Sequence, residues 1–135
     1  MKISTTTFDC NDALPLAQFW GALLGWNVFH DDDPEVVVAP SYPPESGAAL
    51  LFIPVPEDKT AKNRIHLDLT PTDRTRDEEV VRALELGATM FDDRREGDGP
   101  GWAVMLDPEG NEFCILRSDA ERTTAASRTI RLQES

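Results

Sequence analysis

Residues 24–31 read Leu-Gly-Trp-Asn-Val-Phe-His-Asp, and residues 86–93 read Leu-Gly-Ala-Thr-Met-Phe-Asp-Asp. The glycines of the two stretches, Gly25 and Gly87, lie 62 positions apart. Two aspartates placed to begin the preceding helices, Asp12 and Asp73, lie 61 positions apart. Self-similarity at a nearly constant offset is the sequence signature of a repeated structural unit. The two stretches therefore predict a chain built from two copies of one unit.

A helix is expected before each Leu-Gly pair. In the first copy, apolar residues from Leu16 to Leu24 recur at the spacing of one buried helical face. Asp12 is the expected N-cap, and Gly25 closes the helix in a left-handed conformation. In the second copy, the helix is expected to begin at Thr72 or Asp73 and to end at Gly87. Both helices therefore end at the same Leu-Gly signal.

Strand-like segments surround both helices, with β-branched residues and alternating character. One segment precedes each helix and three follow it. The expected strands are residues 3–10, 26–29, 36–39 and 49–55 in the first copy, and 64–70, 88–91, 102–106 and 112–116 in the second. Each copy therefore reads β-α-β-β-β, which places the chain in the α+β class.

The length of 135 residues suits one compact domain, because a chain of this size buries enough surface for a single core. We expect that domain to span residues 1–118, with module one at 1–57 and module two at 62–118. Apolar periodicity fades from residue 119 onward. Residues 119–135 are therefore expected to form a C-terminal surface tail.

The formal net charge of −12 argues against two classes of partner. An acidic surface repels phosphate backbones and anionic lipid headgroups, so neither nucleic acid nor membrane is expected as a partner. No apolar run approaches the length of a membrane span and no basic leader begins the chain, which predicts a cytoplasmic protein. Cys10 and Cys114 are most simply free thiols in such a compartment, with a disulfide left open as the alternative.

Four motifs occur in order along the chain: residues 19–26, 62–69, 86–89 and 107–114. They comprise Phe-Trp with Leu-Leu-Gly-Trp, Lys-Asn-Arg-Ile-His-Leu-Asp-Leu, Leu-Gly-Ala-Thr, and Asp-Pro-Glu-Gly-Asn-Glu-Phe-Cys. In these motifs the chain resembles the vicinal oxygen chelate superfamily, in its glyoxalase-like and bleomycin-resistance-like branch. The resemblance implies a cupped eight-stranded mixed sheet with helices outside and a cavity on the concave side. Members of the superfamily include metal-dependent enzymes and metal-free proteins that sequester antibiotics.

Metal-using members of this superfamily place ligands on the first and last strands of each module. Carried over to this chain, the first-strand positions are His66 in module two and Thr5 in module one, and the last-strand positions are Cys114 and a residue near Ile53. Threonine and isoleucine are poor ligands for a divalent metal. We therefore expect no native metal cofactor. If a metal is bound, the ligands are expected to be His66, Cys114 and Glu112.

Other residues on these strands suggest chemistry without a metal. His66 and Asp68 alternate onto one strand face and could act as general base and electrostatic partner, although Asp68 could instead pair with Arg64 or Lys62. Glu112 is a further acid or base candidate, or a partly solvated residue near the hairpin. Aromatic residues commonly line pockets for drug-sized ligands. Trp20 belongs to the helical core stripe, and the expected ligand-binding residues are Trp102, Trp26, Thr5, Thr7 and Cys114.

These observations favour a binding module that holds an apolar or aromatic metabolite or natural product. The alternative is a metal-dependent lyase, isomerase or dioxygenase that uses His66 with Glu112 or Cys114. A third hypothesis, which we rank last, is that the cupped face binds another protein. The resemblance also implies a homodimer.

Overall fold

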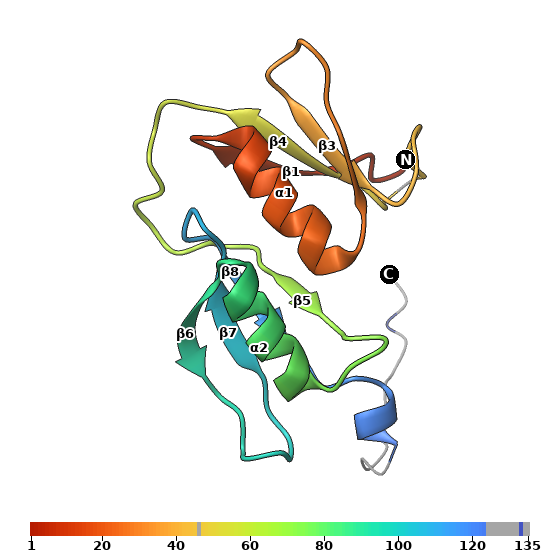
Figure 1. Cartoon of the computed structure of the whole chain (residues 1–135), viewed down its shortest axis with the longest axis vertical. Coiled ribbons are helices and arrows are strands. Elements are labelled where there is room, and N and C mark those ends of the chain that lie inside the picture. The colour runs from red at the N-terminus through yellow and green to blue at the C-terminus, as the bar shows by residue number, and fades with distance from the viewer. Residues whose placement is uncertain (46, 124–132, 134–135) are drawn as a thin grey trace.

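The computed structural model describes residues 1–45, 47–123 and 133, and its elements follow the predicted order (Figure 1). The first module contains β1 (Thr6–Cys10), α1 (Ala13–Leu24), β2 (Asn27–Phe29), β3 (Val36–Ala39) and β4 (Leu50–Pro54). The second contains β5 (Leu67–Leu69), α2 (Arg76–Leu86), β6 (Thr89–Asp93), β7 (Ala103–Leu106) and β8 (Glu112–Ile115). A 3₁₀ helix, η1 (Ala120–Arg122), follows. The duplicated β-α-β-β-β architecture is therefore confirmed.

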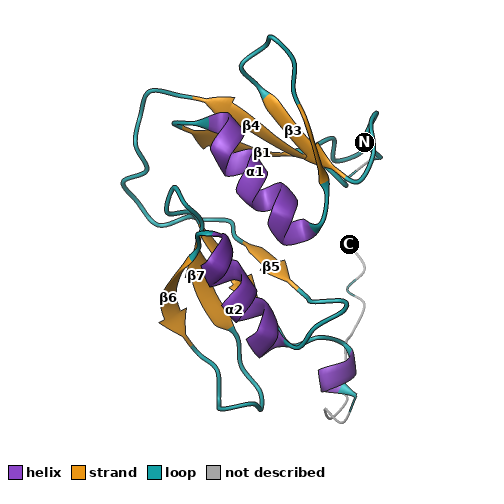
Figure 2. Cartoon of the chain, viewed as in Figure 1, coloured by secondary structure: helices purple, strands orange, loops and turns teal. Residues whose placement is uncertain are grey.

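Each module forms its own four-stranded mixed sheet. The strand orders are β1-β4-β3-β2 and β5-β8-β7-β6, so the two sheets have the same topology. In each, the strand before the helix pairs in parallel with the last strand, and the other neighbours are antiparallel. Figure 2 shows both helices on the same side of their sheets. The opposite face of each sheet is therefore not covered by any helix among the described residues.

Helix α1 begins at the predicted place, but the capping group differs from the expected one. Asp12 has extended backbone geometry at the N-cap position, and its side chain makes no capping hydrogen bond. The Glu109 carboxylate accepts hydrogen bonds from the backbone N–H groups of Asn11 (2.7 Å) and Asp12 (3.0 Å) instead. Because Glu109 lies in the β7–β8 hairpin, the start of α1 is held by the other module.

Helix α2 begins later than predicted. Its N-cap is Thr75, whose hydroxyl accepts from the Glu78 N–H (3.2 Å) while the Glu78 carboxylate accepts from the Thr75 N–H (2.9 Å). This capping box satisfies two backbone donors that would otherwise lack partners, and Asp73 offers no equivalent pair. The expectation of a start at Thr72 or Asp73 was therefore wrong by about one turn.

The two modules share one hydrophobic core. The rings of Phe19 and Trp20 from α1 pack against Phe113 of β8, with centroids 6.1 and 5.1 Å apart. The Trp20 indole donates a buried hydrogen bond to Asp107 (3.0 Å). Arg82 of α2 donates to the carbonyl oxygens of Ala22 and Leu23 at the end of α1. The prediction of Trp20 as a core residue is confirmed, and the modules are fixed against each other.

The segment after residue 118 begins with a docked turn. The Glu121 carboxylate accepts hydrogen bonds from the backbone N–H groups of Ser118 (2.7 Å) and Arg76 (2.8 Å), which ties η1 to the start of α2. The rest of the expected tail lies outside the described residues, and the boundary at residue 118 stays a prediction. Cys10 and Cys114 are free and buried. Within the described chain, neither helix is long and apolar enough to cross a bilayer.

Candidate functional site

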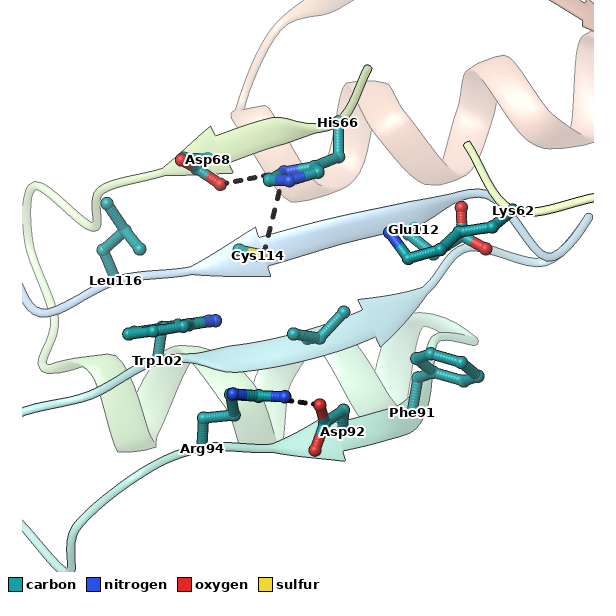
Figure 3. A pocket seen from close by; sticks show the side chains of 11 residues that line it. Lys62, His66, Asp68, Phe91, Asp92, Arg94, Trp102, Glu112, Cys114 and Leu116 are labelled. Carbon is teal, nitrogen blue, oxygen red and sulfur yellow. Dashed lines mark hydrogen bonds and ion pairs between the residues drawn. The ribbon is translucent and has the colours of Figure 1, made fainter. Parts of the chain in front are cut away.

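A cavity of about 390 Å³ lies on the uncovered face of the second sheet (Figure 3). Its apolar wall consists of Phe91 from β6, Val104 from β7, and Trp102 and Leu116 beside the ends of β7 and β8. Trp102 is 41% exposed, so its ring is available at the opening. Val104, Glu112 and Cys114, at even positions of β7 and β8, line this cavity, whereas Met105, Phe113 and Ile115 are buried in the core.

Three polar side chains meet at one end of this cavity. His66 Nδ1 lies 3.1 Å from Asp68 Oδ1 and 3.9 Å from Cys114 Sγ. One ligand atom from each residue falls within 4.8 Å of the others. His66 and Asp68 share a strand face, and Asp68 lies opposite Cys114 in the parallel pairing of β5 with β8. Asp68 therefore pairs with His66, and not with Arg64 or Lys62, the partners that the sequence had left open.

The Cys114 thiol is protonated in this environment at neutral pH. Burial, followed by the nearby Asp68 carboxylate, raises the pKa of Cys114 to about 11 from an ordinary value of 9.0. Both effects disfavour a thiolate, the form that acts as nucleophile or metal ligand. Without a bound cation, Cys114 is therefore a hydrogen-bonded thiol within the cluster.

Glu112 lies beside the cluster without joining it. Its carboxylate accepts from the Lys59 ammonium (3.0 Å) and from the Asn63 backbone N–H (2.7 Å). Burial acts to raise the pKa of Glu112, but these two donors outweigh it and hold the pKa below its ordinary value. Glu112 is 7% exposed, so the expectation of a partly solvated residue was wrong. Both of its oxygens already bind partners, which leaves neither free for a metal in this arrangement.

The other predicted ligand-binding residues lie in different places. Trp26 packs against the hydrophobic core and does not line the cavity. Thr5 and Thr7 have hydroxyl groups 3.2 Å apart and line a second cavity of about 580 Å³, between β1 and the segment that leads into β5. His66 and Glu112 border both cavities. The structure thus brings His66, Asp68, Cys114 and Trp102 together in one cavity. It places Thr5 and Thr7 beside His66 in the other cavity, and Trp26 lines neither.

Comparison with known families identifies the scaffold. A profile of the glyoxalase-like domain matches residues 5–116, which is most of the chain. The chain belongs to the glyoxalase-like domain family. The predicted membership of the vicinal oxygen chelate superfamily is thereby confirmed, and a comparison with curated protein sequences finds no significant match.

Solved structures share the fold of this glyoxalase-like domain. A glyoxalase/bleomycin resistance protein/dioxygenase family enzyme from Burkholderia phytofirmans PsJN matches with a TM-score of 0.61 and 18% identity, over 85% of this chain and 97% of that one. The fosfomycin resistance protein FosX from Mesorhizobium loti gives 0.63 and 15%, over 86% and 90%. TnmS3, an antibiotic binding protein from Streptomyces sp. CB03234, gives 0.60 and 16%, over 86% and 94%. At these identities the likeness establishes the fold alone.

The first sheet of this glyoxalase-like domain carries a related cavity without the polar cluster. It has a volume of about 560 Å³ and is lined by Phe29, Val37 and Leu51 with an acidic rim. Thr7 pairs with Leu51 as Asp68 pairs with Cys114. The first-module counterpart of Cys114 is therefore Leu51. The expected counterpart, Ile53, pairs with Asp9, one pleat further along.

Sequence reasoning did not assign several of the residues that line the second-sheet cavity. Phe91 sits at a β-bulge between Met90 and Asp92 and is 56% exposed. Phe91 is the counterpart of Phe29 in the repeat, and this correspondence is the sequence feature that could have identified it. Arg94 and Lys62 reach the cavity from connecting segments, where no hydrophobic periodicity predicts which way a side chain points.

Arg76 holds the loop beside the cavity, and sequence reasoning did not identify this role. It is fully buried, and its guanidinium donates to the carbonyl oxygens of Gly97 (2.8 Å), Gly99 (2.9 Å), Pro100 (3.2 Å) and Gly101 (3.0 Å). These residues form the β6–β7 connection, which leads directly into Trp102. Arg76 therefore fixes the loop that carries the aromatic residue at the cavity opening.

Proposed function

We propose that this glyoxalase-like domain binds an apolar or aromatic small molecule in the cavity of its second sheet. The observation that carries the proposal is an aromatic and aliphatic wall, made by Phe91, Val104, Trp102 and Leu116, facing a small set of polar groups. Ligand pockets have this composition, and about 390 Å³ lies within their usual range of roughly 300–1,000 Å³. The names of FosX and TnmS3 connect related folds with antibiotics, which supports a natural product as the ligand.

Calorimetric titration with a panel of aromatic compounds tests this proposal. Trp102→Ala removes the exposed indole and is expected to weaken binding at least tenfold, because buried aromatic anchors dominate such contacts. Tyr42→Ala is the matched control, since Tyr42 is an exposed aromatic residue of the first-sheet cavity. Binding that survives Trp102→Ala and disappears in Tyr42→Ala would assign the ligand to the wrong cavity and overturn the proposal.

A second function is favoured by the His66, Asp68 and Cys114 cluster. Imidazole nitrogen, carboxylate oxygen and thiolate sulfur are all ligands of Zn²⁺, and three protein ligands with an open position are typical of catalytic zinc sites. The donor set therefore fits a divalent metal, with Asp68 in the place we had expected for Glu112. Such an ion would supply Lewis acidity at the cavity wall. His66, Asp68 and Glu112 then remain the proposed catalytic residues of a lyase, isomerase or dioxygenase.

Zinc titration distinguishes the two functions. If the cluster is a metal centre, the protein binds one Zn²⁺, and His66→Ala or Cys114→Ala abolishes binding. His30→Ala and Cys10→Ala are matched controls, because they change the chain's other histidine and cysteine, neither of which belongs to the cluster. Equal loss in the control variants, or no stoichiometric binding by the unchanged protein, would rule the metal centre out.

Dimerisation is proposed as part of this function. Phe91 and Trp102 are both substantially exposed at the opening of the cavity, where a second copy would cover them. Light scattering should then give the mass of a homodimer, and Phe91→Ser should shift it toward the monomer. A monomeric mass for the unchanged protein at high concentration would exclude this arrangement. A cytoplasmic location likewise remains a proposal.

A further inference from the structure

Most charged groups that line the second-sheet cavity have partners. Arg94 binds Asp92 (2.8 Å). Asp68 accepts a hydrogen bond from His66 (3.1 Å), whose imidazole balances the carboxylate charge only when it is protonated. Glu112 binds Lys59 (3.0 Å). Lys62 also lines the cavity, yet it takes part in no hydrogen bond or ion pair with any described residue. Lys62 is therefore the cation of this cavity that has no ion-pair partner among the described residues.

The position of Lys62 is fixed by its neighbours in the chain. Glu112 accepts the Asn63 N–H on one side of Lys62, and Lys59 binds both Glu112 and the carbonyl oxygen of Ala61 on the other. Both ends of this short segment are thus attached to β8. Figure 3 shows Lys62 next to Glu112 at the end of the cavity.

We propose that this cavity selects an aromatic ligand that carries an anionic group, with the ring against Trp102 and the anion against Lys62. The inference rests on the proposed binding function and adds the chemical class of the ligand. A carboxylate or sulfonate on the ligand would form an ion pair with the Lys62 ammonium. A cationic ligand would be repelled by Lys62 and would meet Asp92 and Glu112 already paired with Arg94 and Lys59, which leaves Asp68 as its competing partner.

The overall charge of the protein does not oppose this selection at short range. The net charge of −12 repels an approaching anion, but salt screens exposed charges beyond about 8–10 Å. An ammonium in direct contact with the ligand therefore decides the preference. Because Lys62 is exposed to solvent, the gain is modest, and we expect about three- to tenfold tighter binding of an anion than of its neutral isostere.

The experiment compares naphthalene-1-carboxylate with naphthalene-1-carboxamide, which has nearly the same shape without the charge. Both are titrated calorimetrically into the unchanged protein, Lys62→Gln and Lys2→Gln in about 0.1 M salt, which screens the distant net charge. Lys2→Gln is the control, because it removes one positive charge from an exposed terminal residue that lines none of the cavities described above. Trp102→Ala confirms that the heat comes from this cavity.

We expect the carboxylate to bind more tightly than the amide in the unchanged protein and in Lys2→Gln, and equally well in Lys62→Gln. The affinity for the amide should be the same in all three proteins. Equal affinities in the unchanged protein, or a carboxylate preference that persists in Lys62→Gln, would overturn the inference about charge and leave the binding function intact. If neither compound binds and no other member of the aromatic panel does, the binding function itself fails.

Discussion

Replacing Arg76 by Met tests whether the buried guanidinium holds the cavity opening in place. Met keeps most of the apolar stem and removes all five side-chain hydrogen-bond contacts, four to loop carbonyl oxygens and one to Asp77 (2.9 Å). Asp77 is 44% exposed and keeps its ion pair with Arg95 (3.1 Å), so no charge is left buried without a partner. The loss in the free energy of unfolding therefore comes from the missing hydrogen bonds and not from a buried ion without a partner.

Hydrogen bonds to charged groups contribute about 1.5–3 kcal/mol each where the partner stays buried. The loop residues whose carbonyl groups Arg76→Met frees are exposed or half-buried, and three of these carbonyl oxygens share one guanidinium nitrogen. The contributions are therefore not additive. We expect the free energy of unfolding to fall by about 2–3 kcal/mol, which at a typical slope of about 2 kcal/mol/M lowers the urea midpoint by roughly 1–1.5 M.

Urea unfolding followed by circular dichroism measures this loss, and hydrogen exchange locates it. Exchange should accelerate in residues 94–102, where the Arg94 and Glu96 N–H groups bond across the loop to Trp102 and Pro100. Arg74→Met is the matched control, because Arg74 lies two residues away and is 38% exposed. It pairs with the exposed Asp73 (3.1 Å) and with Glu79 (3.5 Å), and Glu79 keeps its ion pair with Arg82 (2.9 Å). The loss in Arg74→Met should stay within about 1 kcal/mol. Equal destabilisation by the two variants would refute the assigned role of Arg76.

Three further predictions follow from the same structure. Gly101→Ala should cost at least about 2 kcal/mol in urea unfolding, because φ is +100° and an added Cβ would lie 2.1 Å from the Arg94 carbonyl oxygen; a neutral effect would contradict the loop geometry. Burial raises the pKa of Cys114 to about 11, so the folded state holds this proton more tightly than the unfolded chain does. The contribution of Cys114 to stability should therefore be constant below about pH 9, and total stability should fall as pH rises from 9 toward 11, less so in Cys114→Ala; equal slopes would contradict this. Glu109→Ala should lower the free energy of unfolding by about 1 kcal/mol, because it removes the acceptor for the Asp12 N–H, whereas Asp12→Ala should change it by less.

The duplicated architecture could be predicted because its signals are local. The glycines after both helices adopt φ of +71° and +119°, a region that other residues rarely occupy, and apolar spacing marks the helices before them. The start of α2 was missed because two signals compete there. Asp73 matches the spacing of Asp12, while Thr75 and Glu78 form the capping box that the structure uses.

The cavity was harder to predict, because its residues come from segments with no periodic pattern. His66, Asp68 and Cys114 could be assigned to one face from strand alternation, and Trp102 follows the same alternation into β7. Lys62 and Arg94 lie in connections, where direction depends on tertiary contacts. Counting residues across unequal loops also misplaced the counterpart of Cys114 at Ile53, whereas the strand register gives Leu51.

The two faces of each sheet are under different physical constraints, which explains why the copies agree in architecture and differ in chemistry. Phe52 and Phe113 are fully buried against the helices, and truncating such residues typically costs about 3–5 kcal/mol. On the opposite face, Leu51 and Cys114 contact a cavity rather than a packed core, so exchanges there cost less. Stability therefore fixes the helix-facing residues of both copies and leaves the cavity faces free to diverge. The polar cluster and the unpaired Lys62 both line the cavity face of the second sheet. Folding does not require these residues there, so ligand binding is the constraint that would keep them.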